Sequence, residues 1–120
     1  DKVKQAVVPD YALGSHVAPL GLAFHSGVGW PADYGAGAIV GLHGSWNRQP
    51  KVGYTVDFVP FSGGRPSGPM RTLLGRFVND AGEARGRPTG MAVDSEGGVL
   101  VADDVGDAVW RLTAEEGGDR

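Results

Sequence analysis

The segment PLGLAF at Pro19–Phe24 returns as PTGMAV at Pro88–Val93, and this repeat decides the fold. In each copy a proline opens a short, mostly apolar run, as expected for a β-strand. Each copy leads on to a second apolar run, Ala38–Leu42 after the first and Val99–Ala102 after the second. A frame that recurs within one chain is typical of repeat architectures, so we expect two related units of short antiparallel strands.

The composition favours strands and turns over helices. The 120 residues include 21 Gly and 8 Pro, and no segment keeps a helical period over three turns. No apolar run approaches the roughly 20 residues needed to span a bilayer, so no transmembrane segment is expected. The net charge of −3 comes without a basic run, which argues against nucleic acid as a partner. The absence of cysteine excludes disulfides and cysteine-ligated metal sites.

The remaining strands follow from alternation and from the breakers that bound them. A leading edge strand is predicted over Val3–Leu13, and Tyr54–Val59 alternates as a half-buried strand that stops at Pro60. Met70–Val78 is predicted as the fourth strand of the first unit, and Ala108–Thr113 as the third strand of the second. We therefore predict an all-β fold, a β-propeller fragment of about two four-stranded antiparallel blades.

The chain is treated as a single partial propeller domain. Its parts are a leading strand and loop (1–17), a first blade (18–80), a second, incomplete blade (85–113) and a polar tail (114–120). Two blades do not close a propeller, which needs about four or more. Either the chain is the C-terminal part of a longer one, or several copies form a ring. The leading strand then belongs to a preceding blade, or it completes the second blade across a closing seam. The chain begins at Asp1 without a signal peptide, so we expect its N-terminus to be set by processing or truncation.

A polar string, HGSWNR at His43–Arg48, follows the buried strand Ala38–Leu42. The connection from His43 to Tyr54 is longer than its counterpart in the second unit, and an enlarged loop at the mouth of a ring is a usual place for ligand contacts. The alternative is a tight turn, with Trp46 packed on the blade and Arg48 solvated.

Antiparallel strands bring several of the polar residues to one face of the molecule. The end of a second strand lies beside the start of the first, so four positions should meet near the central channel: His16 and Pro19, His43–Arg48, Arg85–Pro88, and Asp103–Asp104.

Most of these positions have a functional and a structural interpretation. Asp103 and Asp104 can hold a cation, bond a sugar hydroxyl or pair with Arg85 or Arg87. They can equally form the side-chain turn that Asp favours at a strand end. Arg87 can reach an anionic ligand or form an ion pair between blades. His16 can face the cleft or lie exposed in a loop.

The other aromatic and basic residues are assigned structural positions. His25 should lie on the opposite face from the polar string. Trp30, Tyr34 and Trp110 are expected to pack between blades, and Lys51 is expected to be solvated.

In sequence order, five segments resemble the C-terminal part of the glucose/sorbosone dehydrogenases, which are six-bladed propellers that bind pyrroloquinoline quinone (PQQ). The segments are Ala18–Phe24, His43–Arg48, Gly53–Phe61, Arg87–Asp94 and Val101–Arg111. The resemblance covers the chain from about Val8 to Thr113 and implies two of six blades. The string at His43–Arg48 is its most specific part.

The resemblance assigns cofactor contacts to individual residues. PQQ is a planar tricarboxylate quinone, so its pocket needs cations, amide donors and a flat apolar surface. Arg48 can pair with a carboxylate, Asn47 can donate from its amide, and Trp46 can cover a ring face. His43 can bond a carboxylate or quinone oxygen, and Arg87 is the further cofactor-binding candidate. His16, Asp103 and Asp104 are candidates for substrate or ion contacts.

The same resemblance implies oxidation of a sugar, with hydride passed to PQQ, usually Ca²⁺ at the cofactor, and a periplasmic or secreted location. In that family the general base and the calcium loop lie upstream, so no catalytic residue is expected in this chain. We predict the C-terminal part of a PQQ-dependent sugar (sorbosone/aldose-type) dehydrogenase, forming one wall of the cofactor pocket and inactive alone. The alternative is a non-enzymatic two-blade unit that trimerises into a six-bladed sugar- or ligand-binding propeller. A degenerate propeller without a ligand is a third possibility.

Overall fold

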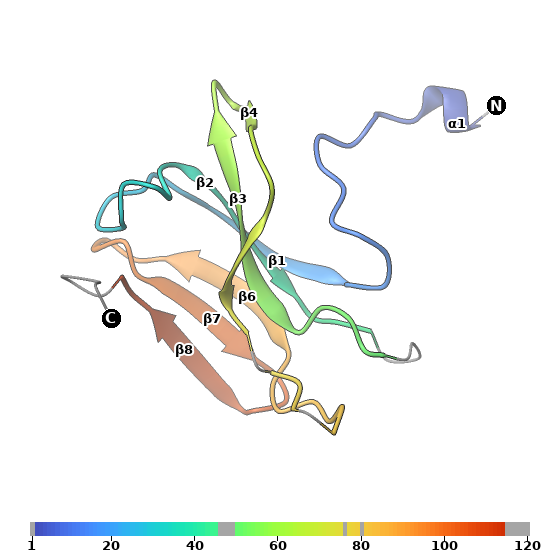
Figure 1. Ribbon diagram of the computed structural model, residues 1–120, viewed down its shortest axis with the longest axis vertical. Helices are drawn as coiled ribbons and strands as arrows, with labels where there is room; N and C mark the ends of the chain where they lie inside the picture. Colours follow the sequence, from blue (N-terminus) through green and yellow to red (C-terminus); the bar gives the residue numbers. More distant parts are fainter. Residues whose placement is uncertain (1, 46–49, 76, 80, 115–120) are drawn as a thin grey trace.

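The computed structural model describes residues 2–45, 50–75, 77–79 and 81–114, which form two antiparallel sheets (Figure 1). In the first sheet β1, β2 and β3 lie side by side, and both β4 and β5 pair with β3. The second sheet has the order β6-β7-β8. The elements are α1 (Lys2–Gln5), β1 (Pro19–His25), β2 (Gly37–Leu42), β3 (Thr55–Ser62), β4 (Arg65–Pro66), β5 (Arg71–Leu74), β6 (Pro88–Val93), β7 (Val99–Asp103) and β8 (Ala108–Leu112). The prediction of an all-β, two-blade fragment is confirmed. Within the described part of the chain, no helix has the length and apolar character that a membrane span requires.

The main core lies between the two sheets. Its buried residues are Ile39, Val56 and Phe58 from the first sheet and Val99 and Val101 from the second, none of them more than 2% exposed. Trp30 and Tyr34 pack against this core, and the Trp30, Tyr34 and Phe58 rings meet edge-to-face with centroids 5.4–5.6 Å apart. The packing role predicted for Trp30 and Tyr34 is therefore confirmed.

A glycine allows the two sheets to meet closely. The repeated segments form β1 and β6, which lie against each other. At Gly21 of β1, a Cβ would lie 2.0 Å from the Thr89 carbonyl oxygen of β6. Only glycine permits that approach of two backbones, so the repeated frame serves as the joint between the two blades.

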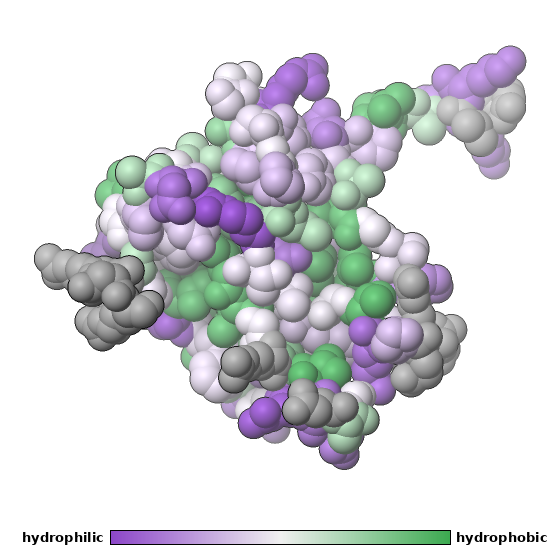
Figure 2. All heavy atoms as spheres, viewed as in Figure 1, coloured by the Kyte–Doolittle hydropathy of each residue, from purple (hydrophilic) through white to green (hydrophobic). Residues whose placement is uncertain are grey.

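The N-terminal arm differs from its prediction. The strand expected over Val3–Leu13 does not form: α1 covers Lys2–Gln5, and the chain from there to β1 is irregular. Val7 and Val8 are 93% and 82% exposed, and Figure 2 shows hydrophobic side chains on the arm standing clear of the body. Pro9 cannot donate to a strand ladder, and none of the described strands pairs with this segment.

The second half of the arm packs on the outer face of the first sheet. Tyr11 and Leu13 contact a buried cluster on that face, which consists of Val17, Ala38, Val40, Leu42 and Val59. The Tyr11 hydroxyl oxygen accepts a hydrogen bond of 2.9 Å from the Met70 N–H. The arm is thereby fixed to the first blade and not to the second.

Two strand boundaries also differ from the sequence predictions. β3 does not stop at Pro60 but runs on to Ser62, because the Phe61 N–H donates to Ala36 O and Pro60 O accepts from Ser67. The fourth strand, β5, is shorter than predicted and ends at Leu74. Gly63 and Gly64 form the turn that links β3 to β4.

Candidate functional site

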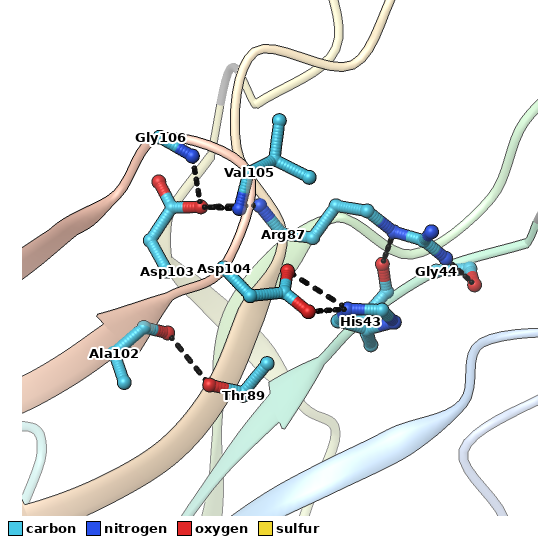
Figure 3. Close-up of polar contacts among 9 residues, drawn as sticks. All are labelled: His43, Gly44, Arg87, Thr89, Ala102, Asp103, Asp104, Val105 and Gly106. Atoms are coloured by element: carbon cyan, nitrogen blue, oxygen red, sulfur yellow. Dashed lines mark hydrogen bonds and ion pairs between the residues drawn. The ribbon is translucent and has the colours of Figure 1, made fainter.

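The ends of three strands meet at one edge of the two sheets, as the antiparallel argument predicted (Figure 3). His43 follows β2, Arg87 precedes β6, Asp103 ends β7 and Asp104 follows it. The His43 Nε2 atom lies 3.1 Å from both carboxylate oxygens of Asp104. This contact joins the first sheet to the second, with the His43 side chain 17% and the Asp104 side chain 55% exposed.

Arg87 holds the backbone that follows β2. Its Nε donates to His43 O and its Nη2 to Gly44 O, both at 2.9 Å (Figure 3). The guanidinium carbon lies 5.1 Å from the centre of the Tyr54 ring, a cation–π distance. Among the described residues, Arg87 forms no ion pair between the blades. The planar fork instead fixes the first residues of the polar loop.

Asp103 is a buried carboxylate that accepts several hydrogen bonds at this edge of the second sheet. It is 4% exposed, and its Oδ1 accepts from the backbone N–H groups of Arg87, Val105 and Gly106 at 2.8–3.0 Å. Its Oδ2 accepts from Trp110 Nε1 at 3.1 Å. The side-chain turn that the sequence left open for Asp103 is what the structure shows. With its oxygens used this way, Asp103 holds the turn that follows β7.

These bonds also set the ionisation of Asp103. Desolvation by itself would raise the pKa of its carboxyl group. The hydrogen bonds from Gly106, Arg87, Trp110 and Val105 favour the charged form more strongly, and the pKa lies below its ordinary value. Asp103 is therefore a carboxylate at neutral pH, suited to accepting hydrogen bonds and unsuited to donating a proton.

Asp104 is the solvent-facing carboxylate of the site. It borders an open cavity of about 390 Å³ lined by Thr89, Ala102, Asp103, Asp104, Asp107, Ala108 and Val109. Within the described ranges, no group of three or more His, Cys, Asp or Glu side chains could hold a metal ion. A hydroxyl-bearing ligand or a shared cation remains the chemistry that Asp104 can serve.

The polar loop after His43 is closed at its base. The Ser45 N–H donates to Val52 O at 2.9 Å, and the Ser45 Oγ accepts from the Val52 N–H at 3.0 Å. The Tyr54 hydroxyl donates to Ser45 O, and a Cβ at Gly44 would lie 2.3 Å from the Tyr54 ring. Trp46, Asn47 and Arg48, the residues that carried most of the predicted cofactor contacts, lie outside the described residues.

Three of the remaining predictions concern basic residues. His16 is exposed, and its neighbour Val17 accepts from the Gly44 N–H, so His16 borders the site without joining the His43 cluster through its side chain. Lys51, expected to be solvated, instead donates to Gly82 O at 2.8 Å and is half-buried. His25 lies at the opposite edge, as predicted, where its Nε2 bonds Gly97 O at 2.8 Å.

Backbone strain gathers around this site. The described non-glycine residues with positive φ are His16, Ala18, Tyr54 and Asp107, at 50–63°. Ala18 bonds the His43 N–H, Tyr54 packs under the loop, and Asp107 lines the cavity. The left-handed conformation costs roughly 1–2 kcal/mol per residue, and such strain is often concentrated at ligand sites. Tyr54 was not predicted as a site residue. The one sequence feature that pointed to an unusual backbone at Tyr54 was the preceding Gly53.

The family model described as TrAA12-like matches residues 3–115. The chain belongs to the TrAA12-like family. A second comparison, with a protein of Borreliella burgdorferi whose function is uncharacterised, gives 34% identity over 107 residues, covering 88% of this chain and 28% of that protein. The pyrroloquinoline quinone-dependent pyranose dehydrogenase of Coprinopsis cinerea is 47% identical over 55 residues, covering 46% of this chain and 7% of the enzyme.

Solved structures share the fold of this TrAA12-like chain. The holo form of the pyranose dehydrogenase PQQ domain from Coprinopsis cinerea superposes with a TM-score of 0.61 and 31% identity, covering 82% of this chain and 27% of that one. The iodide and calcium structures of a Trichoderma reesei protein of carbohydrate-active enzyme family AA12 give TM-scores of 0.69 and 0.68 at 24% identity. They cover 84% and 83% of this chain and 26% and 25% of those chains.

These matches confirm the family that the sequence resembled, a family of PQQ-dependent sugar dehydrogenases. They also define how much of a relative this TrAA12-like chain represents. It spans at most 28% of the length of the curated relatives and solved structures named above.

Proposed function

We propose that this chain is the C-terminal part of a PQQ-dependent sugar dehydrogenase and forms one wall of the cofactor pocket. The observation that carries the proposal is the fixed base of the His43 loop. A guanidinium from the second sheet holds the carbonyls of His43 and Gly44, and Tyr54 holds that of Ser45. A loop anchored at three successive residues can present its outer side chains in a fixed geometry, as a rigid cofactor requires.

The described residues fit PQQ as the base of its binding loop. Two donors of Arg87 are engaged by backbone carbonyls, and the Asp104 carboxylate would repel an anion, so these residues do not by themselves neutralise a tricarboxylate. Charge and stacking would come from Arg48 and Trp46, with an amide donor from Asn47. When bound, PQQ supplies the oxidant that accepts hydride from the sugar.

His43 would contribute one ring nitrogen to the ligand. A carboxylate can only accept, so Nε2 is the donor to Asp104, and in the neutral ring Nδ1 is then the acceptor. Asp104 fixes the ring orientation and remains more than half exposed, so it can also accept a hydrogen bond from a sugar hydroxyl. Calcium, which we propose at the cofactor as in the sequence-based prediction, would take its main ligands outside this chain. An exported location is part of the same proposal and rests on the family alone.

Exposed apolar side chains favour a second candidate function, a two-blade unit that trimerises into a six-bladed ligand-binding ring. Leu20, Leu22 and Phe24 of β1 are 58–65% exposed, and Val109 of β8 is 70% exposed. A neighbouring blade would cover these side chains, whether it comes from the same protein or from another copy. Three copies of the chain would then close a six-bladed ring. The native mass of the 120-residue chain distinguishes the two, since only this alternative predicts a discrete trimer whose Tm rises with PQQ.

The proposal is tested by titrating PQQ, with Ca²⁺ present, into the full-length protein that contains this chain, using equilibrium dialysis. Arg87→Lys keeps the charge but loses the planar fork, so one charge-assisted hydrogen bond to the loop is lost, at a cost of about 1.5 kcal/mol. We expect PQQ affinity to fall about tenfold. Arg48→Ala should weaken binding at least as much.

Arg65→Lys is the matched control, because Arg65 lies on the distant β3–β4 hairpin with its side chain 79% exposed. Its affinity for PQQ should equal that of the unmodified protein. If Arg87→Lys and Arg48→Ala bound PQQ as tightly as Arg65→Lys does, the assignment of the His43 loop to the cofactor pocket would be overturned. A full-length protein that binds no PQQ would overturn the proposed function itself.

A further inference from the structure

One segment of the chain contacts both ends of the His43 loop, the connection between β2 and β3 (residues 43–54). This segment is the connection from β5 to β6, described at residues 75, 77–79 and 81–87. At its end, Arg87 donates to His43 O and Gly44 O, at the start of the loop (Figure 3). In its middle, Gly82 O accepts a hydrogen bond of 2.8 Å from Lys51 Nζ, near the end of the loop. The two connections lie at the same end of the molecule (Figure 1), and one of them holds the other at both ends.

The middle of this segment is a turn organised by Asn79, here called the linker hairpin (described residues 77–79 and 81–85). The Asn79 Oδ1 atom accepts from the N–H groups of Ala81 and Glu83 at 3.0 and 2.9 Å. Its Nδ2 atom donates to Glu83 Oε1 at 3.1 Å, and its carbonyl accepts from the Gly82 N–H at 2.9 Å. An asparagine side chain that accepts from the N–H groups of its own turn fixes the backbone of that turn. The Gly82 carbonyl, which receives Lys51, is therefore presented from a preformed turn.

The base of the linker hairpin is packed against the candidate site. Phe77 is 7% exposed, and its carbonyl accepts from the Arg85 N–H. A Cβ at Gly86 would lie 2.5 Å from both the Phe77 ring and Asp103 Oδ2, so only glycine fits between them. The hairpin is thus fixed to the end of β7, where Asp103 also accepts from the Arg87 N–H.

Lys51 connects the end of the His43 loop to this hairpin. Lys51 is half-buried, although lysine ordinarily extends into water. The next residue, Val52, is bonded twice to Ser45: Val52 O accepts from the Ser45 N–H, and the Val52 N–H donates to Ser45 Oγ. Holding Lys51 against the hairpin therefore also holds the pair of residues that closes the loop at its base.

We propose that Lys51 is a positioning residue for the cofactor and that it acts through the linker hairpin, without contacting the cofactor itself. The inference rests on the proposed function for its ligand, PQQ. Because Lys51 Nζ donates to Gly82 O, its ammonium group serves the backbone of the neighbouring connection. A loop restrained at both ends loses less conformational entropy on binding a rigid ligand than a loop restrained only at its start by Arg87. The bond from Lys51 should therefore raise the affinity for PQQ.

The test measures the PQQ affinity of the full-length protein by equilibrium dialysis with Ca²⁺ present, and amide hydrogen exchange in the same protein without PQQ. Lys51→Met removes the donor and keeps an unbranched side chain, so exchange at Ser45 and Val52 should become faster. PQQ affinity should fall about fivefold, because one charge-assisted hydrogen bond to the hairpin is lost. Lys51→Arg keeps a donor for Gly82 O and should bind PQQ nearly as tightly as the unmodified protein. Lys4→Met is the matched control, since it removes the same charge from the exposed α1 and should change neither measurement.

Asn79→Ala distinguishes an action through the hairpin from a direct contact between Lys51 and PQQ. It loosens the turn that presents Gly82 and leaves the His43 loop unchanged, so it should also weaken PQQ binding. Combined with Lys51→Met it should cause no further loss, because both changes break the same connection. Losses that multiply in the double variant, or an unchanged affinity in Lys51→Met, would overturn the proposal. A full-length protein that binds no PQQ would instead overturn the proposed function, and the exchange measurement, which needs no ligand, would still decide whether Lys51 holds the loop.

Discussion

At the residue scale, the candidate site depends on buried polar groups that are almost fully paired. Asp103 accepts four hydrogen bonds, which connect Arg87, the turn at Val105 and Gly106, and the Trp110 ring to the end of β7. Asp57, in the middle of β3, is the contrasting case. It is 3% exposed, and its Oδ1 has no hydrogen-bond partner among the described residues. A buried carboxylate oxygen without a partner costs about 1–3 kcal/mol.

Replacing Asp57 by Asn should therefore stabilise the protein at neutral pH. Burial raises the pKa of Asp57, although hydrogen bonds from the Thr72 and Thr55 side chains act in the opposite direction. A raised folded-state pKa means that folding favours the protonated form, so the free energy of unfolding falls as pH rises through that pKa. For Asp57→Asn we expect a gain of about 1 kcal/mol at pH 7, measured by urea unfolding.

The gain should vanish at a pH below the unfolded-state pKa of Asp, about 3.9, because the carboxyl group is then neutral in both states. Asp10→Asn is the control, since Asp10 is an exposed partner of Arg65, and its stability should change little at either pH. A gain for Asp57→Asn that is independent of pH would contradict the role of its charge.

At the element scale, tight turns set the strand pairing. The hairpin between β3 and β4 turns through Gly63 and Gly64, with φ of 60° and 79°. Positive φ at both central residues is the type I′ arrangement that matches the twist of the flanking strands. The turn continues the sheet beyond Pro60, which sequence reasoning treated as a stop.

Gly64→Ala should destabilise the protein by about 1 kcal/mol through its backbone alone, because a Cβ there would meet no atom within 4 Å. Gly90→Ala is the control for the cost of the positive φ. Gly90 also has open space around its Cβ position, but its φ is not positive. We expect Gly90→Ala to be neutral or slightly stabilising in thermal unfolding. Similar Tm values for the two variants would contradict the turn geometry.

At the scale of the whole molecule, two sheets are held at a fixed spacing, and the site lies across their joint. His43 and its loop come from the first blade, whereas Arg87, Asp103 and Asp104 come from the second (Figure 3). Any change that separates the blades therefore alters the site without touching its side chains.

Gly21→Ala tests this dependence. The added Cβ would lie 2.0 Å from Thr89 O, so β1 and β6 must move apart, at a cost of about 3 kcal/mol or more. Gly41→Ala is a graded comparison, because its Cβ would meet the flexible Met91 side chain at 3.0 Å and Thr89 O at 3.1 Å. We expect Gly21→Ala to lower Tm more than Gly41→Ala does and to increase amide exchange at His43 and Gly44. The reverse order would mean that the blades do not meet through Gly21.

The sequence was sufficient for the features that depend on local pattern. The repeat of Pro19–Phe24 at Pro88–Val93 predicted two related blades, and strand alternation predicted that His43, Arg87, Asp103 and Asp104 would meet. The sequence-based prediction was wrong for the N-terminal arm, where the apolar residues Val7 and Val8 suggested a strand. A strand forms only where another strand edge is available, and that depends on parts of the molecule distant in sequence.

By itself, then, the sequence determined the all-β class, the repeat, the family and the edge at which the polar residues gather. Only the tertiary structure decided what each of those residues does. Asp103 is buried and fully bonded while the adjacent Asp104 is exposed, and Arg87 holds backbone carbonyls where an ion pair was equally open. Identical residue types acquire different roles because burial and the nearest partners, which set charge state and available lone pairs, are fixed by the packing of one sheet on the other.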